Sequence, residues 1–182
     1  MIYMFCANGV EEVEALATLD VLRRAGFEVT TVGIPDKAVT GSNRITFHTE
    51  IYVSEFEKAA PKTAEAVILP GGMPGTETLA NNKTVCEFVK LIAKQGGLLC
   101  AICAAPSVLG RLGLLKGKKA TCYPGFENML DGATVLPDKV VTDGKTITAK
   151  GMGCAVDFGL AIVSVLKDEK TAGNLAKRIM LK

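Results

Sequence analysis

Short apolar runs alternate with helical patterns along most of the chain, and this alternation limits the folds that it can adopt. Runs of strand length that are apolar enough for full burial lie at residues 2–7, 27–34, 65–72 and 98–103. Helical patterns lie at residues 10–25, 82–94, 106–112, 156–166 and 171–180. Since strands that alternate with helices favour crossover connections, the sequence predicts an α/β fold, a mostly parallel sheet with helices on both faces.

Two segments break this alternation and are typical of β-hairpins. Residues 38–53 contain two β-prone stretches around Gly41, Ser42 and Asn43, and residues 139–151 turn at Asp143-Gly144. A further short strand is predicted at residues 119–124. No linker or internal repeat divides the chain, so residues 1–182 are expected to form a single domain.

The charge and hydropathy patterns argue against two classes of partner. The net charge is +2 without a basic block, which gives no electrostatic support for nucleic-acid binding. No apolar run reaches the roughly 20 residues that cross a bilayer. The first residues carry no basic region and turn acidic at Glu11, so they do not resemble a signal peptide. We therefore expect a cytoplasmic protein without a membrane partner.

Six cysteines lie along the chain, mostly within apolar runs. In a chain without an export signal they are expected to be reduced, and most are expected to be small buried residues. Cys100 and Cys103 form a C-x-x-C pair, which can be redox-active or bind a metal. A second pair is missing and His48 is the only histidine, so we expect no structural metal site.

The segment AICAAP places Cys103 where a strand passes directly into a helix that starts at Pro106. Such a corner strains the backbone and needs small neighbours, which Ala101, Ala104 and Ala105 supply. The free amides and positive dipole at a helix start stabilise a thiolate, so the pKa of Cys103 is expected to be lowered. The alternative is that Cys103 is simply a buried small residue.

Two other loops are expected at the same edge of the sheet, because the carboxyl ends of parallel strands lie together. In LPGGMPG, Gly71 and Gly72 allow a turn whose amides could face a developing oxyanion, although a plain strand-exit turn is the more common explanation of such glycines. CANGVEE leads into a helix whose first turn is acidic, and such residues are usually solvated partners of the helix dipole. The alternative for Glu14 is a carboxyl that remains protonated near a thiol.

No histidine follows Cys103 in the sequence, so a Cys-His hydrolase has no evident base. Tyr123 and Glu127 lie after the next strand and could face the same cleft. His48 lies in the first hairpin, and its simplest interpretation is a surface or interface residue.

Four segments together resemble the DJ-1/ThiJ/PfpI superfamily, most closely its DJ-1 and bacterial ThiJ/YajL-like branch. They are GVEEVEALATLDVLRRAGFEVTTVG, AVILPGGMPG, ICAAPSVLGRLGLLKGKKATCYPGFE and ITAKGMG…DFGLAIV, and they span nearly the whole chain in the family's order. The resemblance implies a flavodoxin-like, doubly wound sandwich that forms homodimers and uses no metal or organic cofactor.

The resemblance also implies roles for individual residues. Cys103 is expected to be the reactive, oxidation-sensitive cysteine, and Glu14 the protonated glutamate beside it. Gly72 and Ala104 match the amides of the oxyanion site. Tyr123 stands where some DJ-1-like members carry histidine, so proton transfer would need another group. Ala104 stands where the protease-like branch carries histidine, which argues against peptidase action.

Two functions remain open from the sequence. In the first, an enzyme of the glyoxalase III or deglycase type uses Cys103 to attack a small reactive carbonyl, with Tyr123 and Gly71 beside the substrate. In the second, a redox sensor or stress chaperone works through oxidation of Cys103 to a sulfinic acid. A role in thiamine biosynthesis rests only on a family label, since no residue pattern supports it.

Overall fold

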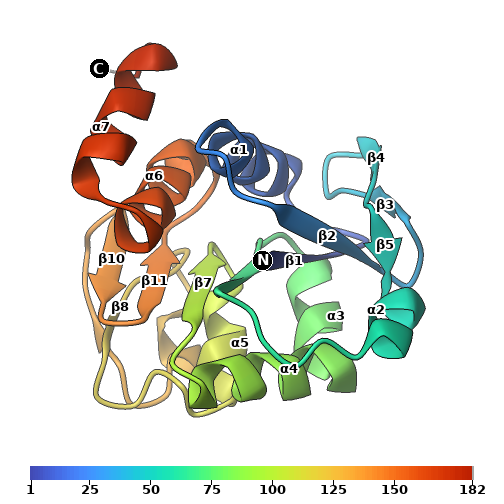
Figure 1. Cartoon of the computed structure of the whole chain (residues 1–182). Helices are drawn as coiled ribbons and strands as arrows, with labels where there is room; N and C mark the ends of the chain where they lie inside the picture. The colour runs from blue at the N-terminus through green and yellow to red at the C-terminus, as the bar shows by residue number, and fades with distance from the viewer. Residues whose placement is uncertain (182) are drawn as a thin grey trace.

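A seven-stranded sheet forms the centre of the computed structural model, which describes residues 1–181 (Figure 1). The strand order is β10-β11-β7-β6-β1-β2-β5, and only the β10–β11 pair is antiparallel. The strands are β1 (Ile2–Ala7), β2 (Val29–Ile34), β5 (Ile51–Tyr52), β6 (Ala66–Leu69), β7 (Leu98–Ile102), β10 (Val140–Asp143) and β11 (Thr146–Ala149). This mostly parallel order confirms the predicted flavodoxin-like fold.

Helices cover both faces of the sheet (Figure 1). One face carries α1 (Glu12–Arg24), α6 (Ala155–Leu166) and α7 (Glu169–Arg178). The opposite face carries α2 (Val53–Ala59), α3 (Gly75–Asn81), α4 (Lys83–Lys94) and α5 (Pro106–Arg111). Short elements complete the description: β3 (Ala38–Thr40), β4 (Thr46–His48), β8 (Lys119–Ala120), β9 (Thr134–Val135), and the 3-10 turns Glu127–Met129 and Met152–Cys154.

Strand β1 is apolar throughout because both of its faces are buried. Ile2, Met4 and Cys6 pack with α1 and α6, whereas Phe5 and Ala7 point to the other face. Side chains alternate across a strand, so a strand between two helical layers buries both sets. On the second face Phe5 packs edge-on against Phe56 of α2, with ring centroids 5.1 Å apart.

The predicted helices at residues 10–25, 82–94, 156–166 and 171–180 are confirmed within one or two residues at most ends. Helix α2 was missed, because residues 51–53 were assigned to the first hairpin. The hairpin itself is confirmed as β3 and β4, but Ile51 and Tyr52 pair in parallel with β2 at the sheet edge. Helix α3 was also missed, since Pro74 and Gly75 are turn residues in sequence.

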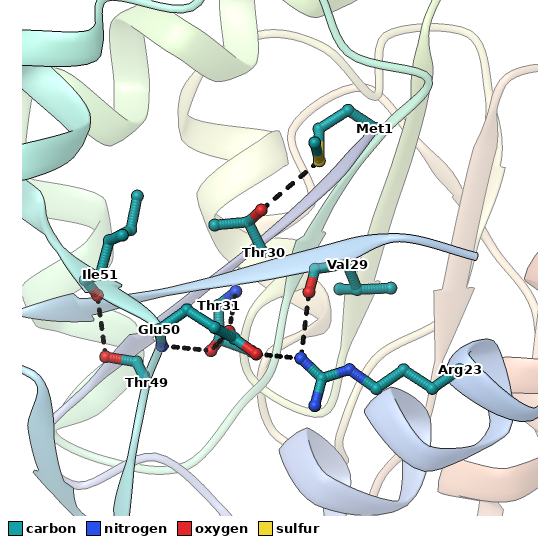
Figure 2. Close-up of polar contacts among 8 residues, drawn as sticks. All are labelled: Met1, Arg23, Val29, Thr30, Thr31, Thr49, Glu50 and Ile51. Atoms are coloured by element: carbon teal, nitrogen blue, oxygen red, sulfur yellow. Dashed lines mark hydrogen bonds and ion pairs between the residues drawn. The ribbon is translucent and has the colours of Figure 1, made fainter. Parts of the chain in front are cut away.

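A polar network fastens this sheet edge to helix α1 (Figure 2). The Glu50 carboxylate accepts hydrogen bonds from the Thr31 N–H, at 2.7 Å, and from Arg23. Arg23 also donates to the Val29 carbonyl at 3.2 Å. Burial raises the pKa of Glu50, but the donors from Thr31 and Arg23 outweigh it, so the net shift is downward. The ionised carboxylate of Glu50, the residue before β5, therefore links β2 to α1.

Candidate active site

The strand order reverses direction at β1 and β6, since β2 lies on one side of β1 and β6 on the other. Ligands of open α/β sheets bind at the carboxyl ends of strands beside such a reversal. The helix start of α1, the glycine turn after β6 and the corner after β7 all lie at these ends. The three loops that the sequence indicated are therefore neighbours in space.

Cys103 occupies the corner between β7 and α5 with a φ of 63°, a conformation that residues with a side chain rarely adopt. Neighbouring backbone groups hold the corner from both sides. The Cys103 N–H donates to the Ala149 carbonyl at 2.9 Å, and the Cys103 carbonyl accepts from the Tyr123 N–H at 2.8 Å. These bonds fix the strained residue, and its side chain is only half-buried.

Glu14 lies in the first turn of α1 and is 1% exposed. Its Oε2 accepts a hydrogen bond from the Gly71 N–H at 2.9 Å. Its Oε1 is buried and has no hydrogen-bond partner among residues 1–181. The Glu11 side chain caps the same helix by accepting from the Glu14 N–H at 2.7 Å, which fixes the backbone of Glu14.

The thiol of Cys103 and the carboxyl of Glu14 shift each other's pKa. Burial raises the pKa of Glu14 to about 7, although the Gly71 N–H and the thiol favour its ionised form. Burial also raises the pKa of Cys103 to about 12, and the charge of Glu14 adds to this. At neutral pH the thiol therefore keeps its proton, whereas the Glu14 carboxyl exchanges its proton readily between the two forms.

The expectation of a lowered pKa at Cys103 is therefore corrected. The amides of Gly72 and Ala104 do act in the expected direction and lower the pKa of the thiol. Burial and the Glu14 carboxylate are the stronger influences, because both disfavour a second negative charge in a confined site. Glu14, Gly72 and Ala104 lie around the Cys103 sulfur, as expected from the sequence. Their roles in a reaction stay predictions.

The two glycines after β6 allow this close approach. A methyl group on Gly71 would lie 2.5 Å from the Cys103 Cβ and 2.7 Å from Glu14 Oε2. Gly72 has a φ of +88°, and a methyl group there would lie 2.3 Å from the Glu11 nitrogen. Any side chain at either position would displace the loops that meet at the thiol.

A cavity of about 640 Å³ lies next to Glu14 of this site, within the range of small-molecule sites. The cavity is lined by Glu11, by Tyr123 and Pro124, by the two ends of the second hairpin, and by the turn before α6: Lys139, Lys150, Gly151, Met152, Gly153 and Cys154. It borders the thiol site at Gly151, because a methyl group on Gly151 would lie 3.8 Å from Glu14 Oε1 and 3.3 Å from the Tyr123 ring. Half of the Tyr123 surface is exposed.

Other residues singled out in the sequence lie apart from this site. His48 is exposed on β4, in the two-stranded sheet formed with β3. Cys100 is buried inside β7 and faces the core under α1 and α6, so it does not share the exposure of Cys103. All six cysteines are free thiols. Glu127 lines a separate cavity with Cys122 and Lys150.

Sequence reasoning missed the wall of the cavity formed by Lys139, Lys150 and Gly151. Their positions at the open end of the second hairpin could have indicated this wall, since ligands of parallel sheets bind at the carboxyl ends of the strands. Within residues 1–181 no group of three or more His, Cys, Asp or Glu side chains is arranged to hold a metal ion. In the same residues, no helix has both the length and the apolar character needed to span a membrane.

The fold and the site together define a flavodoxin-like α/β protein with a cysteine at a strand-to-helix corner and a buried glutamate beside it. The sequence profile of the DJ-1/PfpI family matches residues 1–165. The chain therefore belongs to the DJ-1/PfpI family.

Individual relatives agree with this assignment. Protein dj-1beta of Drosophila melanogaster is 32% identical over 180 residues, covering 96% of this chain and 94% of the relative. Protein DJ-1 homolog B of Arabidopsis thaliana is 35% identical over 97% of this chain, but the chain spans only 40% of that relative. The glutathione-independent glyoxalase DJR-1.2 of Caenorhabditis elegans is 34% identical, covering 94% of this chain and 90% of the relative.

Solved structures agree as well. Oxidized DJ-1 of Toxoplasma gondii superposes with a TM-score of 0.92 at 31% identity, covering 98% of this chain and 97% of the other. The Drosophila melanogaster DJ-1beta structure gives a TM-score of 0.91 at 34% identity, covering 98% and 96%.

Proposed function

We propose that this protein converts small 2-oxoaldehydes into 2-hydroxy acids through Cys103, as a glyoxalase that needs no glutathione. The observation that carries the proposal is the pairing of the Cys103 thiol with Glu14, whose pKa is raised to about 7 by burial. A base with such a pKa is well matched to proton transfer at neutral pH. The name of the Caenorhabditis elegans relative supports the same chemistry.

In the first step the Cys103 sulfur attacks the aldehyde carbon of the substrate. A C–S bond forms while the π electrons of the carbonyl move to its oxygen. Glu14 accepts the thiol proton as the bond forms and returns it to that oxygen, giving a hemithioacetal. This coupling suits a thiol with a raised pKa, because a free thiolate need not accumulate beforehand. The amides of Gly72 and Ala104, which face the sulfur, stabilise charge on the adjacent oxygen.

In the second step a proton leaves the former aldehyde carbon and another is added at the neighbouring ketone carbon. Glu14 is again the base, with an enediol between the two transfers. The first carbon is oxidised to a thioester and the second is reduced to an alcohol, so no outside oxidant is required. Water then cleaves the thioester, which releases the 2-hydroxy acid and restores the thiol.

The test is lactate formation from methylglyoxal in the absence of glutathione. We expect the purified protein to form lactate and Cys103→Ser to lose at least about 100-fold in rate, as expected for removal of a nucleophile. Cys86→Ser is the matched control, because Cys86 is half-buried on α4, away from the site. Equal rates in Cys103→Ser and the unchanged protein would reject the proposal.

A redox sensor or stress chaperone is the second candidate, and the half-exposed thiol beside a protonated acid favours it. Two molecules of peroxide would oxidise the Cys103 thiol in turn, first to a sulfenic and then to a sulfinic acid, each transferring one oxygen atom and leaving as water, and the Glu14 acid would donate to the sulfinate formed. Mass spectrometry after peroxide treatment should then find the added mass of two oxygens at Cys103. Equal oxidation at Cys86 would exclude the sensor.

The expected homodimer also stays a proposal. Two exposed apolar side chains on α1, Val13 at 44% and Leu16 at 38%, support it, because exposed apolar patches commonly mark interfaces between proteins. Sedimentation should find a dimer, and Leu16→Glu should shift it toward the monomer. A monomeric unchanged protein would reject this part of the proposal.

A further inference from the structure

The second hairpin ends in two lysines that stand opposite each other. Val140 pairs with Ala149 at the last position of the β10–β11 ladder, and the Lys150 N–H donates to the Lys139 carbonyl at 2.9 Å. The hydrogen bond extends the antiparallel register by one residue. Opposed side chains in such a ladder emerge on the same face, with Cβ atoms about 4.5–5.5 Å apart.

Two like charges in this arrangement repel each other, and the structure supplies little to balance them. Among residues 1–181, neither Lys139 nor Lys150 has a carboxylate within the 4.0 Å of an ion pair. Opposed like charges destabilise a ladder. An anion bound between the two ammonium groups would relieve this repulsion.

Both lysines line the cavity that borders the thiol site. Its wall at Gly151 adjoins Glu14, and the backbone N–H of Tyr123, another lining residue, donates a hydrogen bond to the Cys103 carbonyl. The rest of the lining is largely apolar, including Met152 and Pro124. The cavity thus combines an apolar middle with a cationic wall, and at Gly151 it adjoins Glu14 of the thiol site.

Two carboxylates line a cavity together with one or both of these lysines. Glu11 lines the same cavity, but its side chain is engaged in capping α1 through the Glu14 N–H. Glu127 shares a neighbouring cavity with Lys150, and its Oε2 accepts from the Gly125 N–H at 2.7 Å. Both acids are thus held by backbone N–H donors two or three residues away in the sequence, and neither forms an ion pair with a lysine of the wall.

We propose that Lys139 and Lys150 form an anion-recognising wall, so that the Cys103 site selects carbonyl compounds carrying a carboxylate over neutral ones of the same size. The substrate part of this inference rests on the proposed function. A 2-oxoaldehyde whose chain ends in a carboxylate would place its aldehyde at Cys103 and its charge at the lysines. Charge complementarity mainly raises the rate at which the substrate binds, so the preference for a carboxylate should appear as a higher kcat/KM.

The closing experiment uses covalent labelling of Cys103, which requires no turnover. The probes are N-(carboxypropyl)maleimide and the corresponding primary carboxamide, which differ in charge but hardly in size. The sulfur adds across the maleimide double bond, and the neighbouring carbon takes up a proton. Peptide mass spectrometry measures the rate at Cys103 alone. We expect the carboxylate probe to react faster, with a preference that declines as salt is added.

Substitution of the lysines then locates the effect. Lys139→Met and Lys150→Met should each lower the carboxylate-to-carboxamide rate ratio about three- to tenfold. Lys145→Met is the matched control: Lys145 lies in the turn of the same hairpin and lines a different cavity, so the ratio should stay unchanged. Glu127→Gln keeps an acceptor for Gly125 but removes a competing charge, and should raise the ratio.

A ratio that is the same in the unchanged protein and both lysine variants would overturn the inference, as would faster reaction of the carboxamide probe. This outcome is separable from failure of the proposed function. A protein that forms no lactate but shows the lysine-dependent preference would lack the activity and retain the anion-recognising wall. A protein that forms lactate without the preference would keep the activity and lose the wall.

Discussion

Gly71 lies so close to Cys103 that a methyl group on its Cα would stand 2.5 Å from the Cys103 Cβ. The Gly71 N–H also donates to Glu14. One residue without a side chain thus lets the glycine turn after β6 reach both the thiol and the carboxyl. The candidate site depends on this contact between two loops that are remote in sequence.

Gly71→Ala should therefore disturb the site and the fold together. The added carbon also meets the Ile102 carbonyl at 2.8 Å, so the loops must separate. We expect a loss of about 1–3 kcal/mol in the free energy of unfolding, measured with denaturant, and a changed labelling rate at Cys103. Gly173→Ala is the control, since no atom lies within 4 Å of its added carbon. Equal stability of the two variants would contradict the prediction.

Glu14 should make the protein less stable as the pH rises from 4.5 to about 7. The pKa of its carboxyl is 4.5 without perturbation and about 7 in the folded protein, because of burial. Across this window the unfolded chain releases a proton that the folded protein keeps, so the free energy of unfolding falls. The decline amounts to about 3 kcal/mol at most. Urea unfolding of Glu14→Gln should lack this part of the pH dependence, whereas Glu28→Gln should retain it. Parallel curves for the two variants would refute it.

Glu14→Gln should also change labelling and turnover in opposite directions. The carboxylate raises the pKa of Cys103, so its removal should let the thiolate form at lower pH and speed alkylation by iodoacetamide several-fold. Turnover of methylglyoxal should fall about 100-fold or more, because the proton acceptor is gone. A purely structural role for Glu14 would move both rates the same way.

Glu12 should hold the first hairpin onto α1. Its buried carboxylate accepts from the Asn43 N–H at 2.8 Å and the Ile45 N–H at 3.2 Å. Burial raises the pKa of Glu12, but these donors outweigh it and the net shift is downward. Glu12→Ala should cost about 2–3 kcal/mol and speed hydrogen exchange at both amides. This stabilisation should be lost as the pH falls, because protonation removes the acceptor charge.

Glu12→Gln provides the companion variant to this prediction, since it keeps an acceptor oxygen of the same reach. We expect a smaller loss of stability and hydrogen exchange closer to that of the unchanged protein. Identical exchange at Asn43 and Ile45 in Glu12→Ala and the unchanged protein would show that the hairpin is held by other contacts.

Local patterns predicted the elements that are regular and strongly patterned. Helix α4 could be found because Asn82 caps it and its apolar residues recur at helical spacing. Helices α2 and α3 were missed because both are short and follow strand-like or turn-like residues. Ile51 and Tyr52 look like the end of a hairpin in sequence, yet the sheet edge beside β2 offers them backbone partners.

Most residues of the candidate site could be predicted from the sequence, as most of the helices and strands could. A thiol at a strand-to-helix corner, with Glu14, Gly72 and Ala104 nearby, followed from loop positions and from the family resemblance. The predicted direction of the Cys103 pKa shift was wrong, because the pKa is raised and not lowered. Helix starts and amides are visible in sequence, but the desolvation that outweighs them depends on how closely other segments pack around the sulfur.

The sequence by itself determined the layered α/β arrangement and the placing of a cysteine at a strained corner, because strand and helix patterns are local and the carboxyl ends of parallel strands coincide. Only the tertiary structure decided how protons are shared between Cys103 and Glu14 and which lysines face the neighbouring cavity. Those properties arise from distances and burial between segments far apart in the chain, and no local pattern encodes them.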